Sequence, residues 1–413
     1  MATILDPGGP PPSRPEAELL LGCARVTMDP ERAGRMRQLL EAPLDWAFLS
    51  RMATRHKVTP LLYRHLNSLD VAGDHLGELR QRFERNIHRN LFLSSELIHV
   101  LKLFDAQRIP ILPFKGPTLA SVAYGNLALR QFADLDILVP REHVAPAQKL
   151  LLAQGYRPQL SFAAQEARLL RSDCQRSFVR DDGRVEVELH WDVAPRYFSC
   201  DLDTERFWER SQPAALGGAS VPSLSREDLL LVLCVHGAKH VWGQLNWICD
   251  VSELLRVSPN LDWEAVRERA AAAGAERMLW LGLFLAHHVL GAALPDAIAR
   301  RLQDRSELRR LTDQVTRGLF IEPGGRPDLF ERSAHQPLAA RVLFHPFHLR
   351  VRERFADRIR YCLRLAFTPS VADWEFVELP SALFFLYHLL RPVRLAGKYL
   401  VRFFRRPTTQ AAL

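Results

Sequence analysis

Hydrophobic positions change their spacing along this 413-residue chain, and the changes divide it into segments. Helical spacing dominates from Pro15 to Arg108 and includes a long amphipathic stretch from about His75 to Gln107. Strand and helix patterns alternate after it, as far as a small-residue linker at 212–225. The expected fold class is therefore α/β, or more narrowly α+β. The expected organisation is a disordered segment 1–14, a helical N-terminal region 15–108, an α/β core 109–211, a helical domain 226–320 and an Arg-rich helical C-terminal region 328–413.

Two aspartates lie inside an apolar run from Ala133 to Val139. The hydrophobic residues of this run alternate with their neighbours, which predicts a buried strand and puts Asp134 and Asp136 on the same face of it. Two ionised carboxylates so close together repel each other unless a cation lies between them. Mg²⁺ is a suitable cation because it binds one or two carboxylates together with phosphate oxygens. The alternative is a solvated strand end, since such short motifs recur by chance.

A glycine turn precedes the two aspartates. The apolar segment Ile109–Phe114 predicts a short strand that ends at Lys115-Gly116-Pro117-Thr118, and a helix is expected to follow. Glycine allows close approach of the backbone, and the start of a helix presents free N–H groups, so the turn is a candidate phosphate site. Lys115 is one of only six lysines in the chain, which favours a specific role for it over a generic surface charge.

A third acidic residue is expected from the segment 184–191. Its strict alternation predicts a strand with Glu186, Glu188 and His190 on one side, paired in a hairpin with residues 178–180. If this strand lies beside the aspartate strand, Glu188 completes a three-carboxylate cluster. Glu186 competes for that place, and the pattern does not decide between them. A half-exposed hairpin with a polar outer face is the non-functional alternative.

Taken together, these motifs resemble an uncharacterised nucleotidyltransferase family of bacteria, within the polymerase-beta-like nucleotidyltransferase superfamily. The resemblance spans roughly residues 30 to 400. The residues that carry it are Lys115-Gly116, Tyr124-Gly125, Arg130, Asp134 to Val139 and Glu188 to Trp191, followed by the segments 228–240, 245–251, 367–374 and 391–392.

The resemblance implies a small mixed-sheet nucleotidyltransferase core and a metal-assisted reaction. A nucleoside monophosphate would pass from an NTP, with ATP as the expected donor, to a small-molecule, peptide or protein acceptor. It implies that two Mg²⁺ ions are held by the catalytic residues Asp134, Asp136 and Glu188. It also implies that the nucleotide is bound by Lys115, Gly116, Thr118, Arg130 and His190.

One position departs from the wider superfamily. Gly-Ser or Gly-Gly is usual at the turn, whereas Gly116 is followed here by Pro117. The serine that would contact the phosphates is missing, so either Thr118 supplies a hydroxyl or Lys115 takes over. The departure leaves a second hypothesis open, that the protein is a catalytically inactive nucleotide-binding or scaffold protein that keeps the same fold.

A second group of polar residues follows the core. His236 and His240 are four residues apart on one expected helix face, which suits zinc, but the glutamate of the H-E-x-x-H protease motif is absent. These histidines are expected to face the cleft together with Trp247 and Asp250. Histidines that are hydrogen-bonded within a helical core are an equally open alternative.

Charge and cysteine usage narrow the class of protein. The net charge is +8, but the basic residues are spread along helices, so no specific nucleic-acid partner is expected. Six scattered cysteines suggest no disulfide framework and favour the cytoplasm. The segment 391–406 is expected to form a basic amphipathic helix that begins at Pro392. Such a helix either lies peripherally on an anionic membrane or docks on the preceding helix at 383–390.

Overall fold

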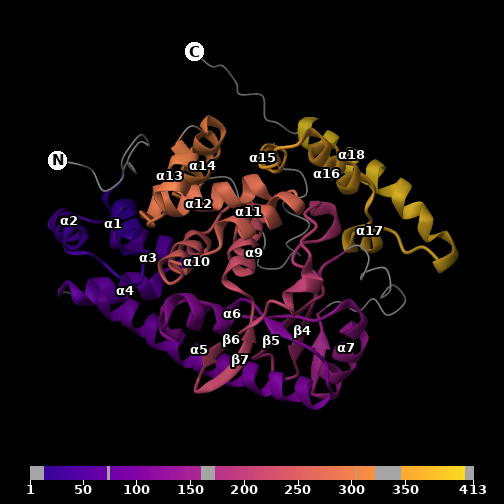
Figure 1. Ribbon diagram of the computed structural model, residues 1–413, viewed down its shortest axis with the longest axis horizontal. Coiled ribbons are helices and arrows are strands. Elements are labelled where there is room, and N and C mark those ends of the chain that lie inside the picture. The colour runs from indigo at the N-terminus through magenta and orange to yellow at the C-terminus, as the bar shows by residue number, and fades with distance from the viewer. Residues whose placement is uncertain (1–13, 72–74, 160–172, 304, 321–345, 405–413) are drawn as a thin grey trace.

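The computed structural model describes all residues except 1–13, 72–74, 160–172, 304, 321–345 and 405–413 (Figure 1). The disorder expected for 1–14 therefore falls almost wholly outside the described residues, as does the end of the segment 391–406. Helices α1 to α5 come first in the chain. Their bounds are Pro15–Cys23, Pro30–Leu40, Trp46–Arg55, Thr59–Ser68 and His75–Ala106.

The strands come next and form two sheets. The five-stranded sheet has the order β1-β2-β5-β4-β3, and β6 and β7 form a separate hairpin. The strands are β1 (Leu112–Pro113), β2 (Leu135–Leu138), β3 (Tyr156–Pro158), β4 (Gln175–Arg180), β5 (Glu186–His190), β6 (Gln212–Leu216) and β7 (Ala219–Ser223). Helices α6 (Gly116–Leu119) and α7 (Val144–Ala153), and the single π-turn η1 (Ala120–Tyr124), lie between strands.

The five-stranded sheet is mixed, as expected from the resemblance. Strand β2 pairs parallel with β5, whereas β1–β2, β4–β5 and β3–β4 are antiparallel. The expected hairpin of residues 178–180 with the 184–191 strand is confirmed by the β4–β5 pairing. The linker expected at 212–225 is wrong, because most of it forms the β6–β7 hairpin, in which Gly217 and Gly218 make the turn with positive φ. The hairpin was not predicted because its strands contain alanine and proline, which have a low propensity for β-strands.

Two hydrophobic clusters hold the parts together. In one cluster, the inward residues of β2 and β5 pack with apolar residues of α5 and α7, and the long helix α5 runs beneath the sheet in Figure 1. In the other cluster, α1 to α4 pack with α9 to α14, and Leu112, Phe114 and Leu138 of the sheet join it. The sheet is therefore packed against helices that precede it and helices that follow it in the chain.

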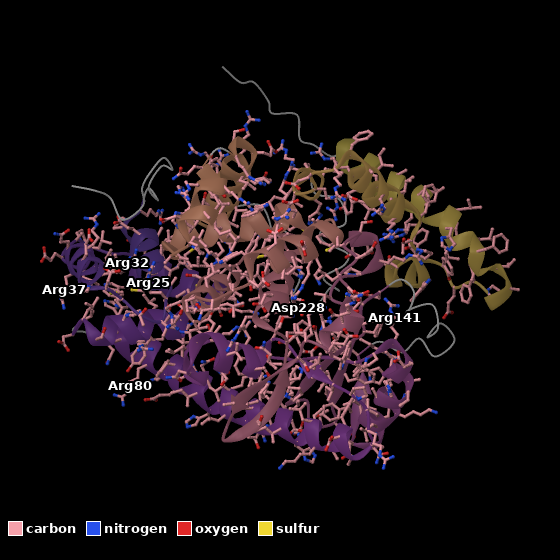
Figure 2. The ribbon with its side chains drawn as sticks, in the orientation of Figure 1. Arg25, Arg32, Arg37, Arg80, Arg141 and Asp228 are labelled. Carbon is pink, nitrogen blue, oxygen red and sulfur yellow. The ribbon has the colours of Figure 1, made fainter. Side chains whose placement is uncertain are left out.

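The later helices complete the fold. They are α9 (Arg226–Lys239), α10 (Leu245–Arg256), α11 (Trp263–Ala272), α12 (Glu276–Leu290), α13 (Asp296–Gln303), α14 (Ser306–Leu319), α15 (Pro346–Arg350), α16 (Phe355–Phe367), α17 (Val371–Phe376) and α18 (Tyr387–Phe404). Helix α9 begins where the hydroxyl of Ser225 caps the N–H of Asp228. Figure 2 places Asp228 in the interior, and there its buried carboxylate accepts hydrogen bonds from Arg210 and Arg269.

The last helix differs from the expectation. It begins at Tyr387 rather than at Pro392, so Pro392 lies inside the helix. The proline removes one N–H donor, but the preceding turn is held because Arg391 donates to the Leu365 carbonyl and to Asp373. Within the described part of the chain, no helix combines the length and the apolar character needed to cross a membrane.

Candidate active site

Parallel pairing of β2 and β5 brings two of the expected acidic residues together. Asp136 lies opposite Glu188 in the register, and Leu138 lies opposite His190. Side chains that are paired in this way point to the same face, so Asp136, Glu188 and His190 converge. Their potential ligand atoms all lie within 4.8 Å of one another. Among the residues that the structure describes, these three form the group suited to holding a metal ion.

Lys115 completes this cluster from the glycine turn. Its Nζ lies 2.5 Å from Oδ1 of Asp136, and both side chains are largely buried. Burial by itself would lower the pKa of Lys115, but the negative charges of Asp136, Glu188 and Asp134 outweigh it and raise the pKa. The lysine is therefore a charged partner of the acidic cluster.

His190 is the second cation on the same carboxylate. Its Nε2 lies 3.1 Å from Oδ1 of Asp136 and 3.4 Å from Oε2 of Glu188. Burial opposes protonation, yet hydrogen bonding to Asp136 raises the pKa of His190 to about 10. For Asp136 the balance is reversed. Burial disfavours the carboxylate, but Lys115 and His190 together lower its pKa. The Phe114 ring packs edge-on against the imidazole, with 5.0 Å between centroids.

Asp134 lies just before β2 and outside the group of three. Its carboxyl group still interacts with Asp136 and Glu188, and burial together with these two charges raises the pKa of Asp134 to about 6, although Lys115 and Lys57 oppose the shift. The charge of Asp136 therefore acts on Asp134, as expected from their spacing in the sequence. Burial is the largest cause of the raised pKa, and the repulsion from the two neighbouring carboxylates adds to it.

The glycine turn fits closely against the backbone next to Asp134. Gly116 has φ +53°, and a Cβ at this position would lie 3.1 Å from the Asp134 carbonyl oxygen. An L-residue is disfavoured both by this conformation and by the close contact. Lys115, immediately before the glycine, is thereby directed at Asp136. Thr118, proposed from the sequence as a hydroxyl donor, is buried in the first turn of α6, and its Oγ1 has no hydrogen-bond partner among the described residues.

The structure separates the two candidate glutamates. Glu188 belongs to the group of three and is 21% exposed, which makes it the most solvent-accessible member. Glu186 lies two residues before Glu188 on β5, opposite Val179 of β4, and accepts a hydrogen bond from Gln159. The third carboxylate beside Asp136 is therefore Glu188.

Arg130 lies behind the cluster rather than in it. Its Nε and Nη2 donate to the two carboxylate oxygens of Asp250 at 2.8 and 3.0 Å, and the hydroxyl of Tyr124 donates to the same carboxylate. Arg130 and Asp250 are both buried. Asp250 was expected to face the cleft, and that expectation is wrong because this ion pair occupies it. The charge of Arg130 still reaches Asp136.

Two lysines that sequence reasoning did not assign to the site act on it from the helical regions. The charge of Lys57, in the turn between α3 and α4, acts on Asp134 and on His240. The charge of Lys239, at the end of α9, acts on Asp173, Cys174 and His240. The scarcity of lysine was the signal that could have found both, because three of six lysines act on this region.

The rings of His236 and His240 pack against each other and against Trp247 at tilted or edge-on angles, next to Lys239 in the sequence. The ring centroids are 4.6 Å apart for the two imidazoles, and 5.5 and 5.3 Å from the indole. Burial is the main cause that holds the pKa of each histidine well below its usual value, and the charge of Lys115 adds to it. Both imidazoles are therefore neutral at pH 7, and the group is an aromatic surface rather than a cationic one.

The donor set suits a hard divalent cation. Asp136 and Glu188 offer carboxylate oxygens, and the imidazole of His190 can hold Asp136 in place. Two cavities of about 400 and 460 Å³ lie elsewhere, beside Arg277, Glu307 and Arg350. The site is thus identified by its chemistry and not by those cavities.

Residues 42–291, more than half of the chain, match the model of a family described as uncharacterised nucleotidyltransferases. This chain belongs to that family. The resemblance drawn from the motifs is thereby confirmed over residues 42–291, and the match does not extend to the segments 367–374 and 391–392. Transfer of a nucleotidyl group is the general activity that the family implies.

The other comparisons add little to the family assignment. The solution structure of the antibiotic-resistance factor ANT(2'')-Ia is similar at 16% identity, over 48% of this chain and 98% of that one, with a TM-score of 0.31. Nothing is argued from a likeness of that extent. Among curated proteins, none matches the chain.

Proposed function

We propose that this nucleotidyltransferase transfers a nucleoside monophosphate from an NTP, with ATP as the first candidate, to an acceptor by an in-line displacement that requires Mg²⁺. The observation that carries the proposal is the parallel β2–β5 register, which puts Asp136 opposite Glu188 beside the Lys115-Gly116 turn. Three carboxyl groups lie near one lysine and one histidine. A cluster that served only as a structural ion pair would not need this many carboxyl groups.

The metal-holding residues are proposed to be Asp136, Glu188 and Asp134. Bound Mg²⁺ would supply charge neutralisation to the phosphates and to the attacking oxygen. His190 donates a hydrogen bond to Asp136 and is proposed as the residue that fixes the orientation of this carboxylate. Glu188, the most exposed of the three residues Asp136, Glu188 and His190, is proposed to accept the acceptor's proton.

Lys115 is proposed to exchange partners when the nucleotide binds. In the structure its ammonium neutralises Asp136. A divalent cation on Asp136 would take over that task, and Lys115 could then donate to the β- or γ-phosphate. The first turn of α6 and the N–H of Gly116 lie beside it. Because the hydroxyl of Thr118 is buried, Lys115 rather than Thr118 is the proposed replacement for the usual serine.

Lys57 and Lys239 are proposed as further phosphate contacts. The charge of Lys57 acts on Asp134, and the charge of Lys239 acts on Asp173. Lys57 precedes the five-stranded sheet in the sequence, and Lys239 follows it. Arg130 is reassigned from phosphate binding to positioning, because Asp250 holds its guanidinium. The neutral surface of His236, His240 and Trp247 is proposed to contact the base or the acceptor by stacking.

The test is a screen of four labelled NTPs with Mg²⁺ and cell extract, comparing wild type with Asp136→Asn and Glu188→Gln. Both substitutions should reduce nucleotide transfer by about a hundredfold or more, in the range seen when groups that stabilise transition-state charge are removed. Glu186→Gln is the matched control, since this glutamate lies on the same strand face outside the cluster, and it should retain activity. If wild type and all three variants bind NTP but none of them turns it over, the hypothesis of an inactive scaffold is favoured instead.

A further inference from the structure

Exposed apolar side chains gather on the C-terminal helices. Of the twelve large hydrophobic residues that the structure shows as exposed in its described part, ten lie between Phe355 and Val393. Large exposed apolar patches on a protein mark protein or membrane contacts, whereas single exposed apolar residues are ordinary. The ten are Phe355, Ile359, Leu363, Phe367, Phe376, Val377, Leu383, Phe385, Leu389 and Val393.

Helix α16 carries four of them in a single stripe. Every fourth residue from Phe355 to Phe367 is exposed, and every fourth residue from Asp357 to Leu365 is buried. At 100° per residue the centres of these two stripes lie on opposite sides of the helix. A helix on a protein surface normally turns polar residues outward. Helix α16 turns an apolar stripe outward instead.

Helix α18 repeats the arrangement beside it. Leu389 and Val393 are 62% and 70% exposed, whereas Tyr387, Arg391 and Leu395 on the opposite side are buried. Helices α16 and α18 contact each other, and Figure 1 shows both, in yellow, along one end of the molecule. Two adjacent helices therefore present apolar side chains away from the body of the protein.

The charges of Arg391 and Arg394, the basic residues of α18 whose side chains the structure describes, point inward. Arg391 is fully buried and donates to Ser370 and Asp373, and Arg394 donates to the other oxygen of Asp373. Burying this charged group while leaving leucine, valine and phenylalanine outside is unfavourable in water alone. The arrangement is better suited to a face that contacts an apolar environment. Arg391 and Arg394 are thus unavailable to lipid phosphates, in contrast to the expectation for the segment 391–406.

The charge around the apolar stripes is positive. Arg354 is exposed next to Phe355 and Arg360 is exposed on the same helix, and beyond Arg394 the sequence contains four more basic residues and no acidic one. Apolar side chains with basic neighbours match a bilayer whose headgroups are anionic. A second copy of this chain would instead bring two positive surfaces together.

We propose that the outward face of α16 and α18, defined by Phe355, Ile359, Leu363, Phe367, Leu389 and Val393, docks on an anionic membrane surface. The apolar side chains enter the boundary between headgroups and acyl chains, and the basic residues around them contact lipid phosphates. The face belongs to helices that contribute no residue to the candidate active site, so the proposal does not depend on the activity.

The experiment is co-sedimentation of the full-length protein with vesicles of phosphatidylcholine alone, or of phosphatidylcholine with 30% phosphatidylglycerol. Wild type should bind the anionic vesicles about tenfold more tightly than the neutral ones, and salt should weaken the binding. Phe355→Glu combined with Leu389→Glu should lower binding to anionic vesicles by roughly tenfold or more, because two apolar anchors become charged.

The control is Leu91→Glu on α5, where leucine is 54% exposed outside the proposed face. It should bind vesicles like wild type, and circular dichroism should show that every variant stays folded. Equal binding by wild type and the double variant, or no binding of wild type to either vesicle, overturns the proposal. So does a dimer in sedimentation velocity that the double variant abolishes, since a second copy would then cover the face.

Discussion

Lys115 and His190 contact the same oxygen of Asp136, so one carboxylate atom is neutralised by two protein cations. One cation comes from a turn next to β1 and the other from the parallel strand β5. This arrangement stabilises an acidic cluster in the absence of a metal, because clustered carboxylates otherwise repel each other. It also means that a metal ion must compete with Lys115 for Asp136.

Replacing Lys115 by methionine should change metal binding and catalysis in opposite directions. Lys115→Met removes the competing ammonium, so Mn²⁺ should bind the nucleotide-free protein several-fold more tightly. Nucleotide transfer should fall by about a hundredfold, because the phosphate contact is lost. Calorimetric titration with Mn²⁺ and a labelled-NTP assay measure the two effects. Weaker Mn²⁺ binding in the variant would show that Lys115 supports the metal site rather than competing with it.

Lys57→Asn should raise the KM for the NTP with a small effect on kcat. Asparagine tolerates the positive φ of 55° at this position, so the substitution removes charge without backbone strain. Loss of one phosphate contact is expected to raise KM about tenfold. Lys149→Asn, at an exposed position of α7, is the control and should leave KM unchanged. A KM that rises equally in both variants would indicate a general charge effect.

Asp250→Ala should destabilise the whole protein. It leaves the buried guanidinium of Arg130 and the hydroxyl of Tyr124 without their acceptor, and breaking a buried ion pair costs about 3–5 kcal/mol. Urea unfolding measures the change in free energy. The double variant Arg130→Met with Asp250→Leu should lose less stability than Asp250→Ala alone, because no unpaired charge remains. If the double variant loses more stability than Asp250→Ala, the unpaired charge of Arg130 costs little.

Protein stability should fall with acid because of His56. Its Nδ1 accepts from the Leu245 N–H and its Nε2 donates to the Leu319 carbonyl, so the buried ring is neutral. Burial is the main cause that lowers the pKa of His56 to about 4. The unfolded state therefore binds a proton near pH 6.5 and the folded state does not. The stability gained from the neutral ring is present above pH 6.5 and is lost as the pH falls toward 4.

Between pH 7 and pH 5 the loss from His56 should be roughly 2 kcal/mol, as follows from about 1.4 kcal/mol for each pKa unit. Urea unfolding at a series of pH values measures it. His99→Gln, at an exposed position of α5, should leave the slope unchanged. His56→Gln should make the slope shallower by one proton. An unchanged slope in that variant would assign the acid sensitivity to other groups.

Local patterns in the sequence were sufficient for strands β1, β2, β4 and β5, although not for the β6–β7 hairpin. Alternation put Glu186, Glu188 and His190 on one side of a strand, and the glycine after an apolar segment indicated the turn at Lys115-Gly116. It did not distinguish Glu188 from Glu186, because that choice depends on the register of β5 against β2, more than 40 residues away in the chain. Register is set by the pairing of both strands and not by either strand alone.

Long-range partners were beyond the reach of the sequence. Arg130 and Asp250 are 120 residues apart, and no local pattern showed that this arginine would be held by a carboxylate on α10 instead of facing phosphate. Lys57 comes from the helical N-terminal region and acts on the site only because α3 and α4 fold back against the later helices. The inward direction of Arg391 and Arg394 on α18 also depends on a tertiary contact, because both donate to Asp373.

The Arg130–Asp250 pair has a practical consequence for protein engineering. The strand-bearing segment supplies the arginine and the tyrosine, while the helical domain supplies the carboxylate. Cutting the chain between them would leave the Arg130 guanidinium without its carboxylate and would expose the sheet residues that share a cluster with the helices. A minimal catalytic fragment excised at residue 211 would therefore be insoluble, and shortened versions of this enzyme must retain α9 and α10.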